Sequence, residues 1–354
     1  MNPWNQPEER EYNQRIFREE LDGFLPERIL DAHIHVGPPE GFPADRPYSC
    51  GGVPLLSYTY EELDRDLAQS YPGRRCEGLC FGFPDADYPN PVLNGYVGER
   101  ADFRRFFPLR LLDPRRDRPD AVRDDLDRCG FLGFKPYPDF ARPGDLPNVE
   151  IPEMLPDWAM AVAEERGLIV MLHIPRPGRL EDPLNGRQLR ELCRRWPRAR
   201  IILAHVGRAY YLRGVEGRLE GLSDLPNLYF DTAMVQNWEV LAHLFRAVPI
   251  RKILFGSDIP IALAQGKAVE INHQYTYVTP RPWSLALCDD RKKLQFTSFL
   301  NEQLRAIRQA AGAVGLSPGE VAAIFYDNAR SLIEETRVRN APASAHSGAP
   351  CPWV

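Results

Sequence analysis

Histidine and aspartate residues stand within or directly after several short apolar runs of the chain. In chain order they are His33, His35, His173, His205 and Asp258. Side chains two positions apart on a strand share one face, so the run over residues 29–36 directs His33 and His35 to the same side. A helical zinc site would instead place two histidines four residues apart. Two or three histidines, one carboxylate and an open coordination position form the usual catalytic metal site, and the chain offers that set.

A single histidine in an apolar strand is more often a hydrogen-bonded core residue than a metal ligand. The number of such histidines changes this interpretation. Of the seven histidines in the chain, four stand at strand positions that could converge, whereas His243 and His273 have helix or loop context and His346 lies in a tail. The pattern therefore predicts a metal site that several strands carry together.

The composition excludes several classes of protein. The chain has 354 residues, 44% hydrophobic content and a formal net charge of -5. No apolar run is long enough to span a membrane, and the N-terminus lacks the cationic and apolar segments of a secretory signal. The net negative charge argues against nucleic-acid binding. We therefore expect a cytoplasmic protein with a small-molecule substrate and no nucleic-acid or membrane partner, and a homo-oligomer stays open.

Eight apolar segments of strand character alternate with helical segments along the chain. Such alternation indicates βαβ units and a parallel sheet, and eight units predict an α/β fold closed as a (β/α)8 TIM barrel. The helices are clearest over residues 121–129, 152–166, 186–196 and 237–247. The expected strands are Ile29–Val36, Gly78–Phe83, Phe106–Leu112, Phe131–Tyr137, Leu168–Ile174, Arg200–Val206, Asn227–Thr232 and Lys252–Asp258.

The positions of polar residues support the barrel independently. Six of them fall at or near the C-terminal ends of the expected strands, namely His35, Lys135, His173, His205, Asp231 and Asp258. That end of a TIM barrel carries the active site. An open, doubly wound sheet is the alternative. It would need a glycine-rich phosphate turn after an early strand, and no G-x-G-x-x-G pattern follows Val36.

We expect one barrel domain over residues 28–336, an N-terminal extension over residues 1–27 and a disordered tail over residues 337–354. The Pro- and Gly-rich loop over residues 37–58 is predicted to fold over the site as a lid. A long insertion, residues 261–295, follows the last strand. It contains Tyr275, Tyr277 and Trp283, and it could form either a subunit contact or a second lid.

Three motifs resemble a known family. They read D-A-H-I-H-V-G at 31–37, F-G-S-D-I-P at 255–260 and I-F-Y-D-N-A-R-S-L at 324–332, and the lone His173 and His205 lie between the first two. In this order they resemble the amidohydrolase superfamily, specifically its amidohydrolase-related (amidohydrolase 2) branch of metal-dependent hydrolases and decarboxylases. The resemblance implies a catalytic metal in a TIM barrel and leaves the substrate open.

The resemblance also implies a role for each candidate ligand. His33, His35, His173 and Asp258 would bind a divalent ion, for which zinc is the first expectation and manganese the alternative. Asp258 would in addition move a proton during catalysis. His205 would either act as a catalytic acid–base or bind a second ion.

Lys135 and Asp231 each allow more than one role. Some superfamily members carry a carboxylated lysine that bridges two metals at the end of the fourth strand, where Lys135 stands. One metal is commoner in the branch that this chain resembles, so Lys135 is more readily a substrate contact or an ion-pair partner of Asp231. Asp231 is expected to orient a ligand histidine or the lysine from outside the metal's ligand set.

Arg176, Arg208 and Tyr137 are the predicted substrate contacts. Each arginine follows a strand-end histidine by three residues, which places both guanidinium groups on loops above the site. A guanidinium binds a carboxylate through two parallel hydrogen bonds, so the substrate is expected to be small and carboxylated. Tyr137 could add an aromatic wall.

Two classes of reaction compete on this scaffold. The first is hydrolysis of an amide, ester or lactone, in which the metal activates water and Asp258 and His205 handle protons. The second is non-oxidative decarboxylation or hydration of a carboxylated substrate. A metal-binding barrel without catalysis is the third alternative, and it would normally have lost a ligand, whereas none is missing here.

Overall fold

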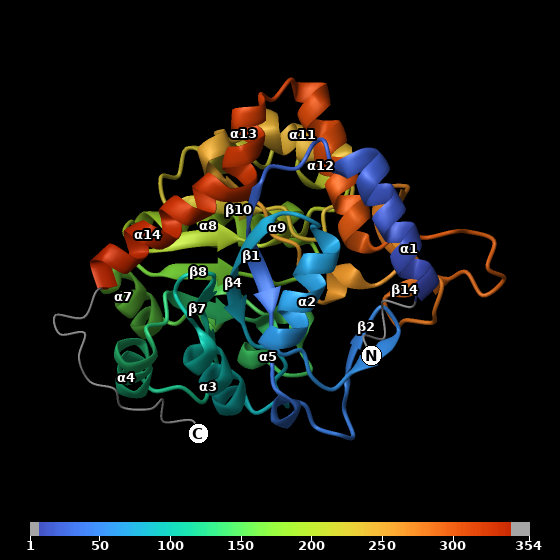
Figure 1. The fold of residues 1–354 in the computed structure, drawn as a ribbon. Coiled ribbons are helices and arrows are strands. Elements are labelled where there is room, and N and C mark those ends of the chain that lie inside the picture. Colours follow the sequence, from blue (N-terminus) through green and yellow to red (C-terminus); the bar gives the residue numbers. More distant parts are fainter. Residues whose placement is uncertain (1–6, 341–354) are drawn as a thin grey trace.

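The computed structural model describes residues 7–340, with parallel strands at the centre and helices around them (Figure 1). One sheet joins β1, β4 and β5, and a second joins β6 to β11 in chain order. Every pair of neighbours in these two sheets is parallel. The strands are β1 (Arg28–His35), β4 (Arg75–Phe81), β5 (Phe106–Pro108), β6 (Arg110–Leu112), β7 (Gly133–Pro136), β8 (Ile169–Leu172), β9 (Arg200–Leu203), β10 (Leu228–Asp231) and β11 (Ile253–Leu254).

Backbone hydrogen bonds close the two sheets into one barrel. β5 and β6 are parts of one strand interrupted at Leu109, whose amide donates to the carbonyl of Cys80 on β4 at 2.8 Å. On the other side, the amide of Ala32 in β1 donates to the carbonyl of Phe255, just after β11, at 2.8 Å. With β5 and β6 taken as one strand the barrel has eight positions, and the predicted (β/α)8 fold is confirmed.

A helix follows almost every barrel strand and packs on its outer side. The predicted helix over residues 152–166 is wrong as a single element, because Pro156 divides it into α6 and α7. Proline has no amide hydrogen and disfavours helical backbone in the residue before it. The helices are α2 (Tyr60–Ser70), α3 (Asn90–Arg100), α4 (Pro119–Cys129), α6 (Ile151–Met154), α7 (Asp157–Arg166), α8 (Pro183–Arg195), α10 (Glu220–Ser223), α11 (Trp238–Ala247) and α12 (Phe299–Val314).

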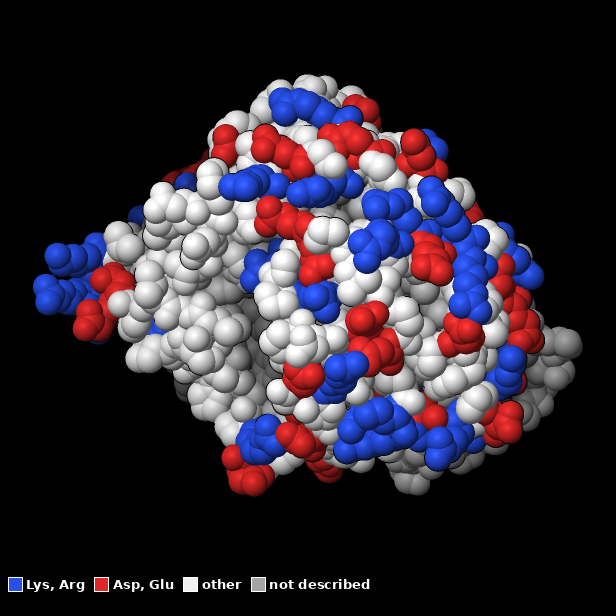
Figure 2. All heavy atoms as spheres, turned by 180° about the vertical axis from the view of Figure 1, so that it is seen from behind, with Lys and Arg blue, Asp and Glu red and all other residues white. Residues whose placement is uncertain are grey.

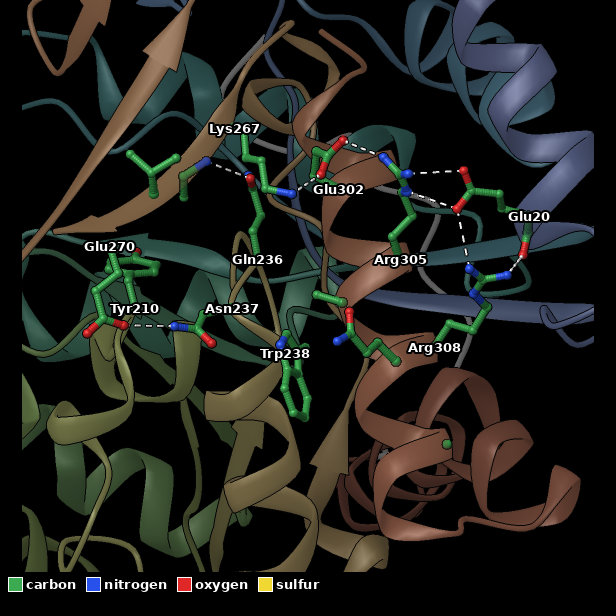
Figure 3. A pocket seen from close by; sticks show the side chains of 15 residues that line it. Glu20, Tyr210, Gln236, Asn237, Trp238, Lys267, Glu270, Glu302, Arg305 and Arg308 are labelled. Carbon is green, nitrogen blue, oxygen red and sulfur yellow. Dashed lines mark hydrogen bonds and ion pairs between the residues drawn. The ribbon is translucent and has the colours of Figure 1, made fainter.

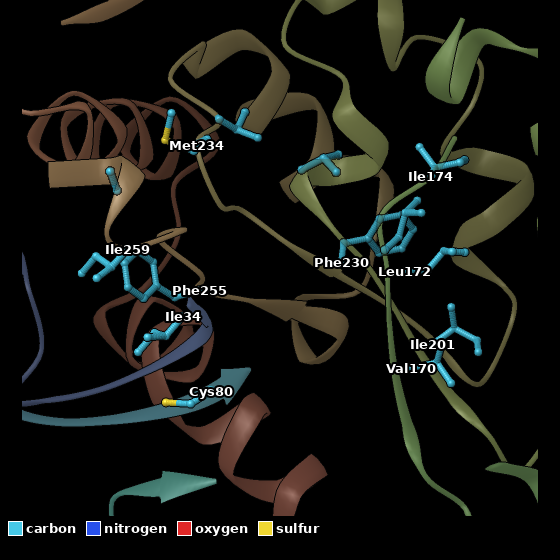
Figure 4. Packing of buried hydrophobic residues seen from close by; sticks show 14 of the residues in the cluster. Ile34, Cys80, Val170, Leu172, Ile174, Ile201, Phe230, Met234, Phe255 and Ile259 are labelled. Carbon is cyan, nitrogen blue, oxygen red and sulfur yellow. The ribbon is translucent and has the colours of Figure 1, made fainter. Parts of the chain in front are cut away.

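Alternating strand residues build two separate apolar cores. Inward-facing residues such as Leu79, Phe107 and Met171 fill the barrel. Their chain neighbours belong to the larger core between strands and helices, where Figure 4 shows, among others, Cys80 and Leu172. This period of two is the pattern of a strand that is buried on both faces.

The last helices close the N-terminal end of the barrel. They are α13 (Pro318–Ala322), η8 (Ala323–Asp327) and α14 (Asn328–Asn340). Tyr326, Ala329, Leu332 and Ile333 pack against the core inside the barrel. α14 continues beyond residue 336, where the predicted domain ends, and the rest of the predicted disordered tail lies outside the described residues.

Three segments lie outside the barrel proper. The loop over residues 37–58 forms a hairpin of β2 (Tyr48–Cys50) and β3 (Val53–Leu55). The insertion forms a small sheet in the order β12 (Lys267–Ile271), β13 (Gln274–Thr279), β14 (Ala286–Cys288). The N-terminal helix α1 (Pro7–Ile16) lies beside α12 in Figure 1. None of the helices within residues 7–340 has the length and apolar character needed to cross a bilayer.

Candidate metal centre

A β-bulge in β1 decides where His33 and His35 point. Leu30 and Ala32 face the inside of the barrel, and strict alternation would send Ile34 inward as well. The pairing with β4 instead shifts between Asp31 and Ile34, so that two residues of β1 oppose one of β4. Ile34 therefore packs in the outer core, and both histidines turn toward the C-terminal mouth of the barrel.

The two histidines of β1 are held by hydrogen bonds at Nδ1. The His35 Nδ1 lies 2.9 Å from the carbonyl oxygen of Gly82, which can only accept, so this nitrogen carries the proton. The His33 Nδ1 lies 2.9 Å from Oδ2 of Asp231. Both arrangements favour the proton on Nδ1 and the lone pair on Nε2, which is the form in which histidine binds a metal.

His205, at the C-terminal end of β9, is also held by a hydrogen bond at Nδ1. It lies after β9, in the short α9 (His205–Arg208), with a φ of 56°. Its Nδ1 lies 3.0 Å from the carbonyl oxygen of Ala233, and its backbone amide donates to Oδ1 of Asp231 at 2.7 Å. Asp231 thus contacts two of the candidate ligand histidines at once.

Asp258 faces the imidazoles of β1 from the loop after β11. Its Oδ1 lies 3.1 Å from Nε2 of His35 and 3.5 Å from Nε2 of His33. Its backbone amide donates to the carbonyl of His33 at 2.9 Å, so the same strand contact that closes the barrel also positions this carboxylate. All three side chains are buried.

Among the described residues, two overlapping groups bring possible ligand atoms within 4.8 Å of one another. They are His33, His35 and Asp258, and His33, His205 and Asp231. This set fits a divalent ion, because the three imidazoles are fixed through Nδ1 and present Nε2. Asp258 adds the carboxylate that a catalytic zinc or manganese site uses.

His173 is part of the mouth but not of either close group. It follows β8, and its ring centre lies 5.3 Å from that of His205 and 4.6 Å from that of Tyr137. Its Nδ1 is buried and has no hydrogen-bond partner among the described residues. A buried unpaired nitrogen of this kind is costly, and a group bound at the mouth could satisfy it.

Lys135 lies directly beside the two histidines of β1. Its Nζ is 3.2 Å from Nε2 of His33 and 4.7 Å from the ring centre of Phe81. Burial lowers the pKa of Lys135 to about 8, although Asp258 and Asp231 oppose the shift. A lysine in this position can contact either a metal ligand or the group that the metal holds.

Burial also shifts the pKa values of the other groups. It lowers the pKa of His205 to about 4, and nearby His33 adds to this shift. Burial alone would raise the pKa of Asp258, but the surrounding imidazoles, led by His33, bring it well below its usual value. The unprotonated imidazole and the carboxylate are the forms that bind a cation.

A pocket of about 200 Å³ opens beside the centre, and the four predicted residues Tyr137, His173, Arg176 and Arg208 are among those that line it. The two arginines differ. Arg176 donates to Oδ2 of Asp182 at 2.7 Å, so its charge is already paired. Arg208 donates to the carbonyl of Ile174 at 3.2 Å and forms no ion pair with any described residue.

The sequence predicted only some of the aromatic residues that surround the mouth of the barrel. Tyr48 of the loop over 37–58 packs on Phe83 at 5.0 Å, and Phe83 packs on His35 at 5.3 Å. From the insertion, Tyr275 packs on Tyr210 at 4.4 Å. The loop and the insertion were recognisable in the sequence, but nothing in it indicated which of their aromatic side chains reach the mouth.

Comparisons with known proteins agree with this geometry. The sequence profile of the amidohydrolase family matches residues 30–334. No curated protein sequence matches the chain. Amidohydrolase 2 from Bifidobacterium longum subsp. infantis is similar in structure, with 15% identity, a TM-score of 0.52, and coverage of 87% of this chain and 99% of that one.

Two further solved structures share the fold. One is 2,6-dihydroxybenzoate decarboxylase from Rhizobium, with 16% identity, a TM-score of 0.52, and coverage of 88% of this chain and 99% of that one. The other is a putative 2-pyrone-4,6-dicarboxylic acid hydrolase from Pseudomonas putida, with 18% identity, a TM-score of 0.53, and coverage of 88% and 98%. Because the profile match covers most of a TIM barrel with the expected histidine and aspartate groups, the chain belongs to the amidohydrolase family, which includes metal-dependent hydrolases and decarboxylases of small molecules.

Proposed function

We propose that the chain is a metal-dependent hydrolase that cleaves a C–N or C–O bond, in an amide, ester or lactone, of a small carboxylated substrate. The supporting observation is the set of His33, His35 and His205, each held through Nδ1 by a protein oxygen, facing the carboxylate of Asp258. Such pre-set ligands with a supporting outer hydrogen bond are typical of catalytic metal sites.

In this proposal His33, His35 and Asp258 hold a zinc ion, with manganese as the alternative, and His173 completes the site. The unpaired Nδ1 of His173 supports that assignment. When bound, the ion would lower the pKa of a water molecule and polarise the scissile carbonyl. Asp258 would accept the proton from the attacking water through a carboxylate oxygen.

His205 would serve the leaving group. Its Nδ1 is engaged with the carbonyl of Ala233, so its free Nε2 is the atom that could carry a proton. Nε2 would take the proton that Asp258 accepted from the water and donate it to the departing nitrogen or oxygen. In the competing role, His205 would bind a second ion, and a carboxylated Lys135 would bridge the two ions. That role predicts two ions per chain instead of one.

Arg208 is the residue that we assign to the substrate carboxylate. Burial lowers the pKa of His173, and the nearby guanidinium of Arg208 lowers it further. Burial raises the pKa of Tyr137, and the same guanidinium opposes that rise. Arg176 lines the same pocket, but its charge is paired with Asp182. Arg208 therefore has the free guanidinium that a carboxylate requires.

One observation favours decarboxylation as a second candidate. Arg208 and His173 line the same small pocket, so a carboxylate bound by Arg208 would lie next to the candidate metal centre. A carboxylate held there could be the group that leaves as carbon dioxide. The two reactions differ in products, since hydrolysis consumes water and forms no carbon dioxide.

Elemental analysis of protein purified without chelator or added metal tests the site, followed by hydrolysis and decarboxylation assays on the same sample. We expect about one zinc or manganese ion per chain, lost in His33→Ala and kept in the control His243→Ala, whose imidazole lies outside the centre on α11. Two ions per chain would favour the bridged form. Absence of bound metal, even after metal is added back, would contradict the proposal. Release of carbon dioxide without hydrolysis would show that the enzyme is a decarboxylase instead.

A further inference from the structure

The small sheet of the insertion is attached to the barrel along one edge. Figure 3 shows its strand β12 beside α11 and α12, where Lys267 pairs with Glu302 at 2.6 Å. The amide of Ala268 donates to Oε1 of Gln236 at 2.7 Å, and Asn237 donates to Glu270 at 3.0 Å. These residues line a pocket of about 660 Å³, and the contacts hold β12 in a fixed position.

The middle of the sheet is attached to the mouth of the barrel. Tyr275 packs on Tyr210, and Tyr277 packs on Phe299 of α12 at 5.1 Å. The hairpin of β2 and β3 touches the insertion so closely at Gly52, where φ is +83°, that a Cβ there would lie 2.2 Å from the carbonyl oxygen of Pro282. The ring centres of Tyr210 and His205 are 6.4 Å apart, so the inner side of the sheet packs against a residue next to the candidate centre.

The opposite edge of the sheet is unpaired and apolar. β14 pairs only with β13 among the described residues. Leu287 on β14 is 58% exposed, and Leu285 in the turn just before β14 is 62% exposed. Leu294, just beyond, is 57% exposed. Of the seven large hydrophobic residues exposed within residues 7–340, four lie between residues 271 and 294.

Such an edge is a hazard unless something covers it. An open strand edge presents unpaired amide and carbonyl groups, and proteins normally protect it with charge, proline or a covering element. Apolar residues gathered on a protruding surface are typical of protein–protein contacts. In Figure 1 the segment around β14 extends away from the body of the molecule, so the barrel itself leaves it open.

The charged residues next to this edge favour a second copy of the chain as its partner. Asp290 is followed directly by Arg291, Lys292 and Lys293, and none of the four forms an ion pair within the described part of the chain. Figure 2 shows this protruding segment with both signs of charge at its tip, next to a broad face with few charged residues. In a twofold interface the same surface meets itself, so a surface that carries both signs side by side can place each sign opposite the other.

We propose that the β14 edge, defined as residues 285–294, is the interface between two copies of this chain related by a twofold axis. Leu285, Leu287 and Leu294 of each copy would cover one another near the axis. The acidic side chain of Asp290 in one copy would face Arg291 and Lys293 of the other. Because the inner side of the same sheet carries Tyr275, dimer formation would also stabilise the packing next to the candidate centre.

Sedimentation velocity of the full chain tests the apolar part. We expect the native chain to be a dimer at micromolar concentration. The double variant L285E/L287E should raise the dissociation constant at least about 100-fold, because it replaces two apolar side chains per copy that the interface would bury. The control V338E changes an exposed residue of α14 and should leave the dimer intact. A monomeric native chain, or a double variant that still dimerises, would overturn the proposal.

A charge exchange tests the choice of a second copy as partner. D290K gives a tip with mainly positive charge, and R291E combined with K293E gives a mainly negative one. Asp289, which accepts from the amide of Leu294, and Lys292, with a φ of 49°, remain unchanged so that the backbone is preserved. Each variant alone should dimerise more weakly, and a mixture of the two should recover the dimer. No recovery on mixing would contradict the twofold charge pairing.

Discussion

The two ends of the barrel place buried charges in opposite situations. At the N-terminal end, Glu77 accepts hydrogen bonds from Tyr326 at 2.8 Å, from Arg330 at 2.8 Å and from Arg28 at 3.2 Å, so both of its oxygens are satisfied. At the C-terminal end, the buried Nδ1 of His173 has no hydrogen-bond partner among residues 7–340, and Lys135 lies against His33.

The backbone shows the same difference. Residues with a positive φ gather on the loops at the C-terminal end, and they are Arg176, Arg179, His205, Val206, Arg208, Met234 and Asp258. Near the N-terminal end, Phe103, before β5, is the only described residue other than glycine with such a conformation, and the others there, such as Gly73, Gly130 and Gly167, are glycines. Conformations of this kind cost on the order of 1–3 kcal/mol each and persist where the surrounding structure imposes them.

The comparison separates stability from function. The N-terminal end consists of satisfied ion pairs above a packed apolar plug, which contributes to stability. The C-terminal end holds groups that are incompletely satisfied until something binds them. Substitutions at the two ends should therefore have opposite effects on activity and on the free energy of unfolding.

The largest effect is expected from H33A and D258N. Each should lower metal content and activity together by more than about 100-fold. Substitution of residues that only hydrogen-bond to metal ligands already lowers metal affinity or activity about 10–100-fold, and loss of a ligand should cost more. Elemental analysis measures the metal content, and thermal unfolding checks that each variant is folded. Full metal content in either variant would contradict the site as described.

The matching change at the other end is L332A. Leu332 is 3% exposed in the plug of the barrel, and its truncation should reduce the free energy of unfolding by about 2–5 kcal/mol through lost burial and a cavity. Denaturant unfolding measures this loss. Turnover and metal content of the folded variant should be unchanged, and a fall in either would show that the two ends are not independent.

D231N should give an intermediate effect. The carboxylate of Asp231 accepts from the amide of His205 and contacts Nδ1 of His33, so its loss should weaken metal binding by about 10–100-fold without removing a ligand. Competition with a chelator of known affinity gives the dissociation constant. An unchanged constant would mean that Asp231 does not orient the histidines.

The smallest effect should distinguish the two arginines of the pocket. R208M should raise KM for a carboxylated substrate about 10-fold or more, because a charge-assisted contact is lost, and should leave KM for a neutral analogue nearly unchanged. R176M removes a partly exposed pair with Asp182 and should change KM by less than about 5-fold. Equal effects of the two variants would contradict the assignment of Arg208.

Much of this protein could be predicted from local patterns. The eight strand positions follow from apolar runs of strand length, because a parallel strand covered on both faces must be apolar almost throughout. The C-terminal placement of His205, Asp231 and Asp258 follows from chain order alone, since all strands of the barrel run in the same direction.

Other features depend on contacts between distant segments. A strictly alternating β1 would have sent His33 and His35 outward, and only the shifted pairing with β4 turns them inward. The sequence presents Arg176 and Arg208 as equivalents. The fold pairs Arg176 with Asp182, whereas Arg208 forms no ion pair within the described part of the chain.

The sequence by itself therefore determined the barrel, the order of the candidate ligands and the end of the barrel at which they lie. These properties depend on hydrophobic periodicity and chain direction, which are local. Only the tertiary structure decided which histidines lie within ligand distance, which arginine is unpaired and which edge of the insertion is open. Each of those outcomes depends on register and packing between residues far apart in the chain, and neither quantity is encoded in the spacing of a single segment.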